Sequence, residues 1–470
     1  MSWAARTPPG PPRRELPRLF RKLVTDRLGL LSEAAELGDA VQVVLGPRTL
    51  HVFNHPDHAK HVLADNSASY HKGIGLTEAK RALGDGLLTS EGELWRRQRR
   101  AAQPSFQHKH LGAQAAVIAE EAAQLVARLR THVGGEPVDF TGELTDLTLS
   151  VLGRTLLDTD LSAHGAVGHA FEAVQDQAMF EMVTQGMVPL WAPLPRQRRF
   201  RRARAELQGV VDQLVAEHGA RSAEGGAKSA EGGAGSAEGG AGSVEGDDLL
   251  SRLIEFTRQE PDPRVGRQRL RDDLVTLLLA GHETTASTLG WTFHLLDRHP
   301  WAAERVRDEA VAALGVRLPG LADLHRLPYT TMVVQEAMRL YPPVWILPRR
   351  AQRPDDVGGY HVPVGTDVLI CPYTLHRHPA FWPEPERFDP ERFDPERPVE
   401  RPRYAYIPFG AGPRFCIGSN LGMTEAVLVT AMIARELSLR TAPGREAVPE
   451  PMLSLRVKGG LFVQVRAAGT

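Results

Sequence analysis

Two kinds of hydrophobic spacing alternate along the chain, and the helical kind covers most of it. Apolar residues recur every three or four positions, the period of a helix with one buried face, at 111–132, 144–157, 203–218, 270–299 and 330–341. Short apolar and β-branched segments around glycine- or proline-containing turns predict three β-hairpins, at 41–53, 360–370 and 453–465. The pattern therefore predicts a mainly helical fold with a small β region.

One segment shows no regular spacing of apolar residues. Residues 222–242 repeat a seven-residue unit rich in glycine, alanine and glutamate. A heptad can indicate a coiled coil, but this unit has paired glycines and no apolar seam. Its composition is that of a flexible linker. The repeat marks either a domain boundary or an insertion in a surface loop, and we prefer the insertion because the motifs on its two sides belong together.

Composition narrows the class of protein. The 470 residues carry a formal net charge of −1, so no global charge attracts the chain to nucleic acid or acidic membranes. Two cysteines cannot build a disulfide framework and suit a reducing compartment. Residues 1–12 form a proline-rich tail, with no signal peptide and no apolar run near the ~20 residues of a membrane span. We therefore expect a soluble, cytoplasmic protein without a membrane span.

The candidate chemistry centres on Cys416, which lies in the glycine-rich run FGAGPRFCIG at 409–418. An apolar helix is predicted directly after it, at 419–439. The positive end of that helix and the charge of Arg414 favour the thiolate, the form that binds metal. A zinc site lacks a second cysteine nearby, and the surroundings match no hydrolase nucleophile turn. Cys371, in an apolar run, is predicted to be a small core residue.

A second unusual feature lies inside the apolar segment 270–299. The run AGHETT at 280–285 places a glycine beside an acid and an alcohol, Glu283 and Thr284, in a helix interior. Glycine costs about 1 kcal/mol relative to alanine there, and a buried carboxylate needs a partner. A zinc motif H-E-x-x-H is excluded because its second histidine would be Ala286. Alone, the run fits a buried polar pair or a functional site equally well.

Two further patterns are weak when taken alone. Glu336 and Arg339 are three apart and can pair on one helix face. The tetrapeptide P-E-R-F follows twice, which makes Arg387 and Arg392 alternative candidates for a second arginine beside them.

A basic segment at 95–100 places Trp95 and Arg99 four apart, on one helix face. An indole N–H and a guanidinium together suit a carboxylate of a bound group. A solvated basic face is the plainer interpretation, and nucleic acid is disfavoured by the near-zero net charge.

Together these elements resemble the cytochrome P-450 family in kind and in order. The family signature F-x-x-G-x-R-x-C-x-G is matched at Phe409, Gly412, Arg414, Cys416 and Gly418. The run at 280–285 is similar to the family's A/G-G-x-D/E-T-T/S motif, and E-x-x-R followed by P-E-R-F completes the pattern. The resemblance spans 1–470 as a single domain, apart from the tail and the repeat. Gly422 departs from it, because the family usually has alanine there.

The resemblance implies a bound haem b (iron protoporphyrin IX) with Cys416 as its axial thiolate and metal ligand. Glu283 and Thr284 would be the catalytic pair, with Thr284 holding dioxygen and its water and Glu283 relaying protons. The other residues implied to bind the cofactor are Trp95, Arg99, Arg349, Phe409, Arg414 and Gly418.

A structural cluster and a substrate pocket are implied in the same way. Glu336, Arg339 and a second arginine would brace the loop beneath the haem, and we favour Arg392 over Arg387 for that position. The implied pocket residues are Leu277, Ala280, Val344, Trp345, Ile346 and Leu453.

The implied function is that of a monooxygenase, which inserts one atom of O2 into an apolar organic substrate by C–H hydroxylation or epoxidation. No dinucleotide fingerprint or iron–sulfur cysteine set is present, so we expect a ferredoxin and an NAD(P)H-dependent ferredoxin reductase as partners. Arg96, Arg97 and Arg100 would remain free for a partner surface, which could dock an acidic redox protein. A peroxide-dependent haem-thiolate enzyme and a non-catalytic haem gas-binding or sensor module are the alternatives.

Overall fold

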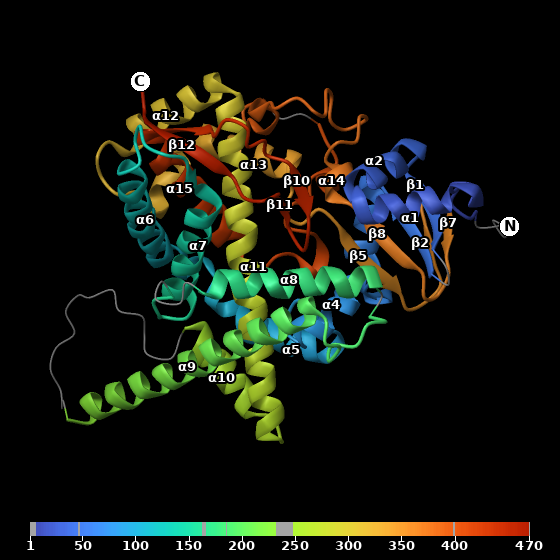
Figure 1. The fold of residues 1–470 in the computed structure, drawn as a ribbon, viewed down its shortest axis with the longest axis horizontal. Helices are drawn as coiled ribbons and strands as arrows, with labels where there is room; N and C mark the ends of the chain where they lie inside the picture. Colours follow the sequence, from blue (N-terminus) through green and yellow to red (C-terminus); the bar gives the residue numbers. More distant parts are fainter. Residues whose placement is uncertain are drawn as a thin grey trace.

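Helices dominate the structure, a computed structural model that describes residues 6–45, 48–161, 166–184, 186–231, 248–397 and 400–469 (Figure 1). The α-helices are α1 (Leu16–Thr25), α2 (Arg27–Leu37), α3 (Pro56–Lys60), α4 (Leu76–Leu83), α5 (Gly92–Ala102), α6 (His108–Arg130), α7 (Phe140–Leu156), α8 (Ala166–Thr184), α9 (Pro195–Glu231), α10 (Leu249–Arg258), α11 (Pro263–Arg298), α12 (Pro300–Leu314), α13 (Pro328–Leu340), α14 (Pro372–Leu375) and α15 (Ser419–Glu436). Short turns of 3-10 helix, or π-helix in η2, are η1 (Arg13–Glu15), η2 (His61–Asp65), η3 (Ser67–Ser69), η4 (Gln103–Phe106), η6 (Leu321–Arg326), η7 (Pro390–Phe393), η8 (Arg403–Ala405) and η9 (Gly412–Arg414).

The strands form a small β region in four sheets. They are β1 (Ala40–Leu45), β2 (Arg48–Phe53), β3 (Tyr70–Lys72), β4 (Val138–Asp139), β5 (Leu347–Ala351), β6 (Asp355–Val357), β7 (Tyr360–Val362), β8 (Asp367–Ile370), β9 (Leu437–Thr441), β10 (Pro449–Pro451), β11 (Leu455–Val457) and β12 (Phe462–Ala467). The largest sheet has the order β1-β2-β8-β5-β3, with β2 and β8 parallel and the other pairs antiparallel. A three-stranded sheet has the order β4-β12-β9. The predicted fold class, mainly α with a small β region, is confirmed.

The five segments with helical spacing lie in α6, α7, α9, α11 and α13, so these predictions are confirmed. The helix predicted at 419–439 is too long at its end. Helix α15 stops at Glu436 because Leu437 begins β9, which pairs with β12. Among the described residues, no helix has both the length and the apolar character needed to cross a bilayer.

The first predicted hairpin is confirmed, since β1 pairs with β2. The other two are wrong, because each turn carries the chain from one sheet to another. Strand β7 pairs with β6, while β8 lies between β2 and β5. Likewise β11 pairs with β10, while β12 lies between β4 and β9.

The backbone of α9 is helical to Glu231, so the first part of the repeat, 222–231, continues this helix. Extending an existing helix avoids the cost of nucleation, and alanine and glutamate are good helix formers. Residues 232–242 lie outside the described residues, so the insertion in a surface loop stays a prediction.

The proline-rich tail, described from residue 6, is held against the small β region. The backbone N–H of Gln42 donates to the carbonyl oxygen of Pro9 at 2.8 Å. Further along, His361 N–H donates to the carbonyl oxygen of Arg6 at 2.9 Å. These bonds supply partners for a segment whose prolines cannot donate.

Helix α11 runs through the middle of the helical region, with α7 on one side and α13 and α15 near its C-terminal part (Figure 1). Its residue Trp291 is fully buried and stacks on Tyr341 with ring centroids 3.9 Å apart. The indole N–H of Trp291 donates to the carbonyl oxygen of Leu455 at 2.9 Å. This contact joins the central helix to α13 and to strand β11, and it keeps the polar end of a large buried ring satisfied.

Candidate active site

The loop that carries Cys416 is closed on itself and against the chain at 61–65. The backbone N–H of Cys416 donates to the carbonyl oxygen of Phe409 at 2.9 Å. Gly412 has a φ of 68°, and a Cβ there would lie 1.9 Å from the carbonyl oxygen of Leu63. Only glycine fits that position, because the backbone is left-handed and the neighbour is main chain. Gly410 also has a positive φ, of 70°, but a Cβ there would meet nothing within 4 Å.

The surroundings of Cys416 correct one expectation about its charge. Burial raises the pKa of its thiol, and a backbone hydrogen bond from Gly418 and the charge of Arg99 oppose that rise. Arg99 is held beside the loop, because its Nη2 donates to the carbonyl oxygen of Phe415 at 2.8 Å. Arg414 turns away instead and pairs with Glu91. The cation that favours the thiolate is therefore Arg99, whereas the sequence suggested Arg414.

The cysteine loop and the middle of α11 are brought together by α15. A Cβ at Gly422, near the start of α15, would lie 3.8 Å from Oγ1 of Thr285, an ordinary contact that would also accept alanine. On the two segments joined in this way, Cys416 and Ala280 are both accessible to solvent. An accessible residue in the middle of a core helix, together with an accessible cysteine on the neighbouring loop, fits a site that receives a large group.

The acid and alcohol of α11 have the partners that a helix interior requires. Thr284 is partly exposed and its Oγ1 donates to the carbonyl oxygen of Ala280 at 2.8 Å. Burial raises the pKa of Glu283 to about 7, although a hydrogen bond from the Ser454 hydroxyl at 2.7 Å opposes the rise. A carboxyl with that pKa can hold or release a proton near neutral pH.

The other residues of the motif at 280–285, Gly281 and His282, have roles in packing. A Cβ at Gly281 would lie 2.7 Å from both methyl carbons of Leu152, so the glycine lets α7 pack closely against α11. His282 is buried, its ring Nδ1 lies 2.7 Å from the carbonyl oxygen of Leu278, and burial lowers its pKa to about 4. No group of three or more His, Cys, Asp or Glu side chains arranged to hold a metal ion occurs among the described residues.

The predicted anion-binding residues lie in a buried excess of positive charge. Arg349 on β5 is paired in register with Lys72 on β3, and both are buried. Burial and the charge of Arg414 lower the pKa of Lys72 to about 7 and that of Arg349 to about 10. Glu91 is the carboxylate that these three cations share. Because Lys72 with a pKa of about 7 is only partly protonated at neutral pH, the three basic groups around one carboxylate leave between one and two positive charges to be neutralised by a bound group.

Trp95 lies next to this cluster on α5. The guanidinium carbon of Arg414 stands 4.9 Å from the centroid of its ring, and that of Arg99 stands 5.9 Å from it. Sequence reasoning missed Lys72 and Glu91. Nothing in the sequence around them signals a role, because the cluster forms only when β3, β5, the cysteine loop and the start of α5, where Glu91 lies, meet.

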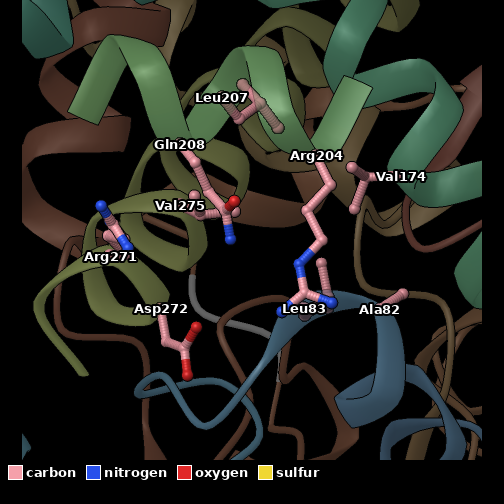
Figure 2. Close-up of a pocket in the computed structure, with 9 residues that line it drawn as sticks. All are labelled: Ala82, Leu83, Val174, Arg204, Leu207, Gln208, Arg271, Asp272 and Val275. Atoms are coloured by element: carbon pink, nitrogen blue, oxygen red, sulfur yellow. The ribbon is translucent and has the colours of Figure 1, made fainter. Parts of the chain in front are cut away.

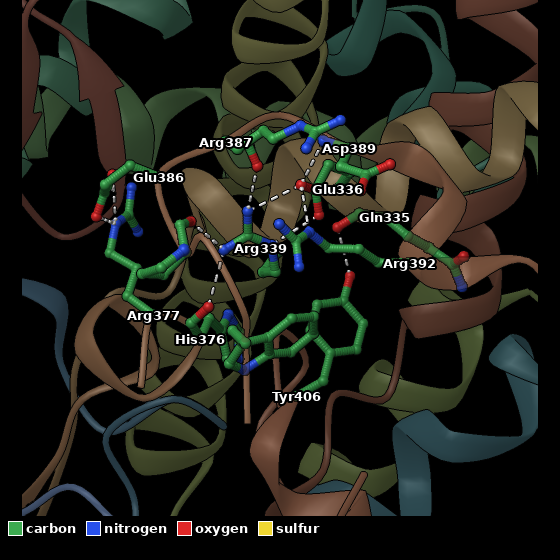
Figure 3. A network of polar contacts seen from close by, with 12 residues as sticks. Gln335, Glu336, Arg339, His376, Arg377, Glu386, Arg387, Asp389, Arg392 and Tyr406 are labelled. Atoms are coloured by element: carbon green, nitrogen blue, oxygen red, sulfur yellow. Dashed lines mark hydrogen bonds and ion pairs between the residues drawn. The ribbon is translucent and has the colours of Figure 1, made fainter. Parts of the chain in front are cut away.

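Glu336 and Arg339 form a fully buried ion pair on α13 (Figure 3). The two bonds are Nε to Oε2 at 2.7 Å and Nη2 to Oε1 at 2.8 Å. The remaining N–H groups of Arg339 donate to the carbonyl oxygens of His376, Pro385 and Arg387, at 2.7–3.1 Å. The pair therefore fixes the course of the chain between 376 and 387.

The two P-E-R-F copies have different environments. Arg392 lies with its Nε 3.5 Å from Oε1 of Glu336, and its side chain is 8% exposed. The side chain of Arg387 is 61% exposed and pairs with Glu384. Of the two arginines, Arg392 is the one beside the cluster, while Arg387 contributes a backbone carbonyl.

The same region reaches the start of the cysteine loop. Ring Nε2 of His376 accepts a hydrogen bond from the backbone N–H of Ile407 at 2.8 Å, and the indole of Trp382 donates to the carbonyl oxygen of Ala405 at 3.2 Å. The hydroxyl of Tyr406 donates back to Gln335 on α13 at 2.8 Å. Contacts with α13 and with the segment that it fixes therefore hold the chain at 405–407, just before the cysteine loop; Figure 3 shows the bond between Tyr406 and Gln335.

The residues predicted to line a substrate pocket differ in exposure. Trp345 is buried in a core cluster with Cys371 and donates its indole N–H to the carbonyl oxygen of Met452. Cys371 is fully buried, as predicted for a core residue. The other predicted lining residues are exposed or partly exposed, namely Leu277, Ala280, Val344, Ile346 and Leu453.

A shallow pocket also lies between α4, α8, α9 and α11 (Figure 2). Arg204 extends from α9 toward Leu83 on α4, and Asp272 on α11 accepts the backbone N–H of Asp85 at 2.8 Å. The lining residues are Ala82, Leu83, Val174, Arg204, Leu207, Gln208, Arg271, Asp272 and Val275. None of them is among the individual residues predicted for the active site.

Of the three arginines expected to be free for a partner, Arg97 is engaged with the protein, because it lies 3.6 Å from the buried Glu260. Arg96 and Arg100 are exposed, and Arg96 pairs with the exposed Glu93 at 3.0 Å. Arg97 also stands over the ring of Phe256, which joins α5 to α10.

Replacing Arg392 by alanine should lower the free energy of unfolding by about 2 kcal/mol, because Glu336 loses a buried cationic neighbour. The matched substitution Arg387→Ala should change it by less than about 0.5 kcal/mol, since that side chain is exposed. Denaturant titration of both variants checks this expectation. Equal effects would contradict the assignment of Arg392 to the cluster.

Gly412→Ala should destabilise the cysteine loop more than Gly410→Ala does. Both variants bear the cost of a left-handed alanine, about 1 kcal/mol, but only the first also forces a methyl group into the Leu63 carbonyl. Retention of bound haem during gel filtration and denaturant titration compare the two variants. Similar losses in both would show that the contact with Leu63 has no role.

Comparisons with known proteins agree with this geometry. The cytochrome P-450 family model matches residues 9–463. Cyclooctatin synthase of Streptomyces melanosporofaciens is 37% identical over 91% of this chain and 89% of its own. From the same organism, cyclooctat-9-en-7-ol 5-monooxygenase is 35% identical over 94% and 91%. Pentalenene oxygenase of Streptomyces avermitilis is 30% identical over 90% and 89%. With its cysteine loop, α11 motif and buried Glu–Arg pair in one fold, the chain belongs to the cytochrome P-450 family.

Proposed function

We propose that the protein is a haem-thiolate monooxygenase that inserts one atom of O2 into an apolar organic substrate, by C–H hydroxylation or epoxidation. The observation that carries this proposal is the accessible Cys416 on a loop closed by glycine, beside the helix that holds Glu283 and Thr284. Cys416 would bind the iron of haem b through its sulfur. When bound, the haem supplies the oxygen chemistry, and electron donation from a thiolate ligand favours O–O cleavage.

The buried charges fit that cofactor. Lys72, Arg349 and Arg414 surround one carboxylate, Glu91. Haem b carries two propionates, which would neutralise the remaining positive charge. Trp95 and Arg99, on the neighbouring helix α5, are the further candidates to hold it.

Glu283 and Thr284 would deliver protons at the site. The raised pKa of Glu283 lets its carboxyl donate a proton and recover it near pH 7. Ser454 orients the carboxyl through the 2.7 Å hydrogen bond. Thr284 offers a hydroxyl on the next residue, in the partly exposed stretch of α11.

The substrate class follows from the relatives and from the exposed apolar side chains. Two relatives are named as oxygenases of cyclooctat-9-en-7-ol and of pentalenene. Both compounds are terpenoids. Leu277, Ala280, Val344, Ile346 and Leu453 offer aliphatic contacts and no charge. We therefore propose a terpenoid hydrocarbon or alcohol as the substrate, a cytoplasmic location, and a ferredoxin with an NAD(P)H-dependent reductase as electron donors.

Thiolate ligation is tested by the absorption of the reduced, CO-bound protein. The wild-type protein should show the band diagnostic of a thiolate ligand, and Cys416→Ala should lose it. Cys371→Ala is the matched control and should retain the band, because Cys371 is buried in the core. A band that survives Cys416→Ala would contradict the ligand assignment. Turnover with peroxide and none with a reductase system would favour a peroxide-dependent enzyme.

The role of Glu283 predicts a pH dependence. If its carboxyl donates protons, product formation should fall as pH rises through about 7, where the carboxyl loses its proton. Glu283→Gln should be slower and should lose this inflection. In Ser454→Ala the inflection should move to higher pH, because the lost hydrogen bond favours the carboxylate. An identical pH profile in all three proteins would remove Glu283 from the proton path.

A further inference from the structure

A cavity of about 320 Å³ lies between the C-terminal ends of α11 and α13 and the segment 377–388. Its volume falls within the range of about 300–1,000 Å³ in which proteins bind small molecules. Its lining includes no residue of the cysteine loop and neither Glu283 nor Thr284. Arg298, which does line it, follows Thr284 by fourteen residues on α11, about 21 Å along a helix. A ligand in this cavity would therefore be distinct from the substrate.

The walls of the cavity are fixed by buried contacts. The ring of Tyr341 stacks on that of Trp291, with centroids 3.9 Å apart. On the opposite segment, Arg339 donates to the carbonyl oxygens of Pro385 and Arg387 at 2.7 and 3.1 Å. Walls that are already in place lower the cost of ordering the protein around a ligand.

The lining carries an excess of positive charge. Three arginines, Arg298, Arg377 and Arg387, and one acid, Glu386, contribute to it. Nε of Arg377 donates to both carboxylate oxygens of Glu386, at 3.0 and 3.2 Å, so these two charges cancel (Figure 3). Arg387 pairs with Glu384, but both of these side chains are more than half exposed. An exposed ion pair is weak, so a more highly charged anion can compete for Arg387.

Two polar groups of the lining have no partner within the described part of the chain. Arg298, the last residue of α11, is exposed and has neither an ion pair nor a side-chain hydrogen bond. The hydroxyl of Tyr341 makes no hydrogen bond either, and burial raises its pKa. The charges of Arg377 and Arg298 oppose that rise, so both guanidiniums lie close enough to act on the phenol. Unsatisfied donors therefore face the cavity from α11 and from the end of α13.

We propose that this cavity binds a small organic phosphate, a phosphate monoester on an apolar carbon skeleton. A phosphate group carries about 1.5–2 negative charges near pH 7 and three strong acceptor oxygens, so it can accept from α11, Tyr341 and Arg387 together. A carboxylate has two oxygens in one plane, which suit a single guanidinium fork. The apolar side chains of Leu295, Leu340 and Phe388 also line the cavity. They offer contacts to a carbon skeleton that inorganic phosphate lacks.

Titration calorimetry of the haem-loaded, full-length protein tests this proposal. The probes are phenyl phosphate, inorganic phosphate and phenylacetate, each added in a buffer free of phosphate. We expect phenyl phosphate to bind with a dissociation constant of about 1 mM or lower, and the other two probes to bind at least about tenfold more weakly. The absorption spectrum of the haem should stay unchanged, because the cavity lies away from the cysteine loop.

Variants locate the bound phosphate. Arg298→Gln should weaken the binding of phenyl phosphate by about tenfold, the effect of one lost charge-assisted hydrogen bond. Tyr341→Phe keeps the stacked ring and should weaken binding by about threefold, since it removes one neutral donor. Arg264→Gln is the matched control, because Arg264 is exposed near the other end of α11, and should bind as the wild type does. Far-UV circular dichroism verifies that each variant is folded.

Four results would overturn the proposal. The first is the absence of saturable binding of phenyl phosphate. The second is equal binding of phenylacetate or of inorganic phosphate, because the cavity would then not recognise a phosphate monoester. The third is unchanged affinity in both Arg298→Gln and Tyr341→Phe, and the fourth is a shift of the haem spectrum, because the ligand would then lie elsewhere. None of these measurements requires turnover, so this proposal and the monooxygenase function can fail independently.

Discussion

The buried ion pair between Glu336 and Arg339 is the constraint on which the rest of the site depends. Burying two charges is costly, so the pair is stable only if every donor of the guanidinium finds an acceptor. Arg339 has five N–H groups, and five acceptor contacts are made to them: two from Glu336 and three from main-chain carbonyls. The main chain between 376 and 387 must follow this geometry. Because His376 and Trp382 bind the backbone at 405–407, the cysteine loop begins where the pair dictates.

Sequence reasoning succeeded where the signal is local or a motif has a fixed order. The long helices follow from apolar spacing. The Cys416 loop, the Glu283–Thr284 pair and the Glu336–Arg339 pair stand out in the sequence alone. Sequence reasoning failed for two hairpins, because a turn signal in the sequence indicates that the chain reverses direction but not which strands then pair. Residues of β8 pair with residues of β2 that lie 317 positions earlier in the chain, as Asp367 pairs with Leu50. No local sequence pattern encodes that choice of partner.

The cluster of Lys72, Glu91, Arg349 and Arg414 shows the same limit for the residues of the site. Lys72 and Glu91 could not be inferred from the sequence, because their role arises only from the meeting of four segments: β3, β5, the cysteine loop and the start of α5. The assignment of Arg414 as the cation nearest the thiol followed sequence distance, whereas the structure places Arg99 of α5 there. A net charge of −1 likewise concealed a run of six arginines without an acid, between 196 and 204. The charge at a site depends on which residues are neighbours in space. The net charge of the whole chain does not show such local differences.

The tandem P-E-R-F-D sequence at 385–394 has a consequence for how the chain reaches its native state. Both copies can offer an arginine to Glu336, so a slipped arrangement, five residues out of register, competes with the native one during folding. The phenylalanines discriminate between the two. Phe388 is buried against His299, with ring centroids 4.6 Å apart, while Phe393 meets Tyr406 at 4.9 Å. A slip of five residues would place one of these rings in the site of the other and leave the second aromatic site without a phenylalanine. Aromatic packing therefore favours the native register, whereas charge alone does not distinguish the two copies.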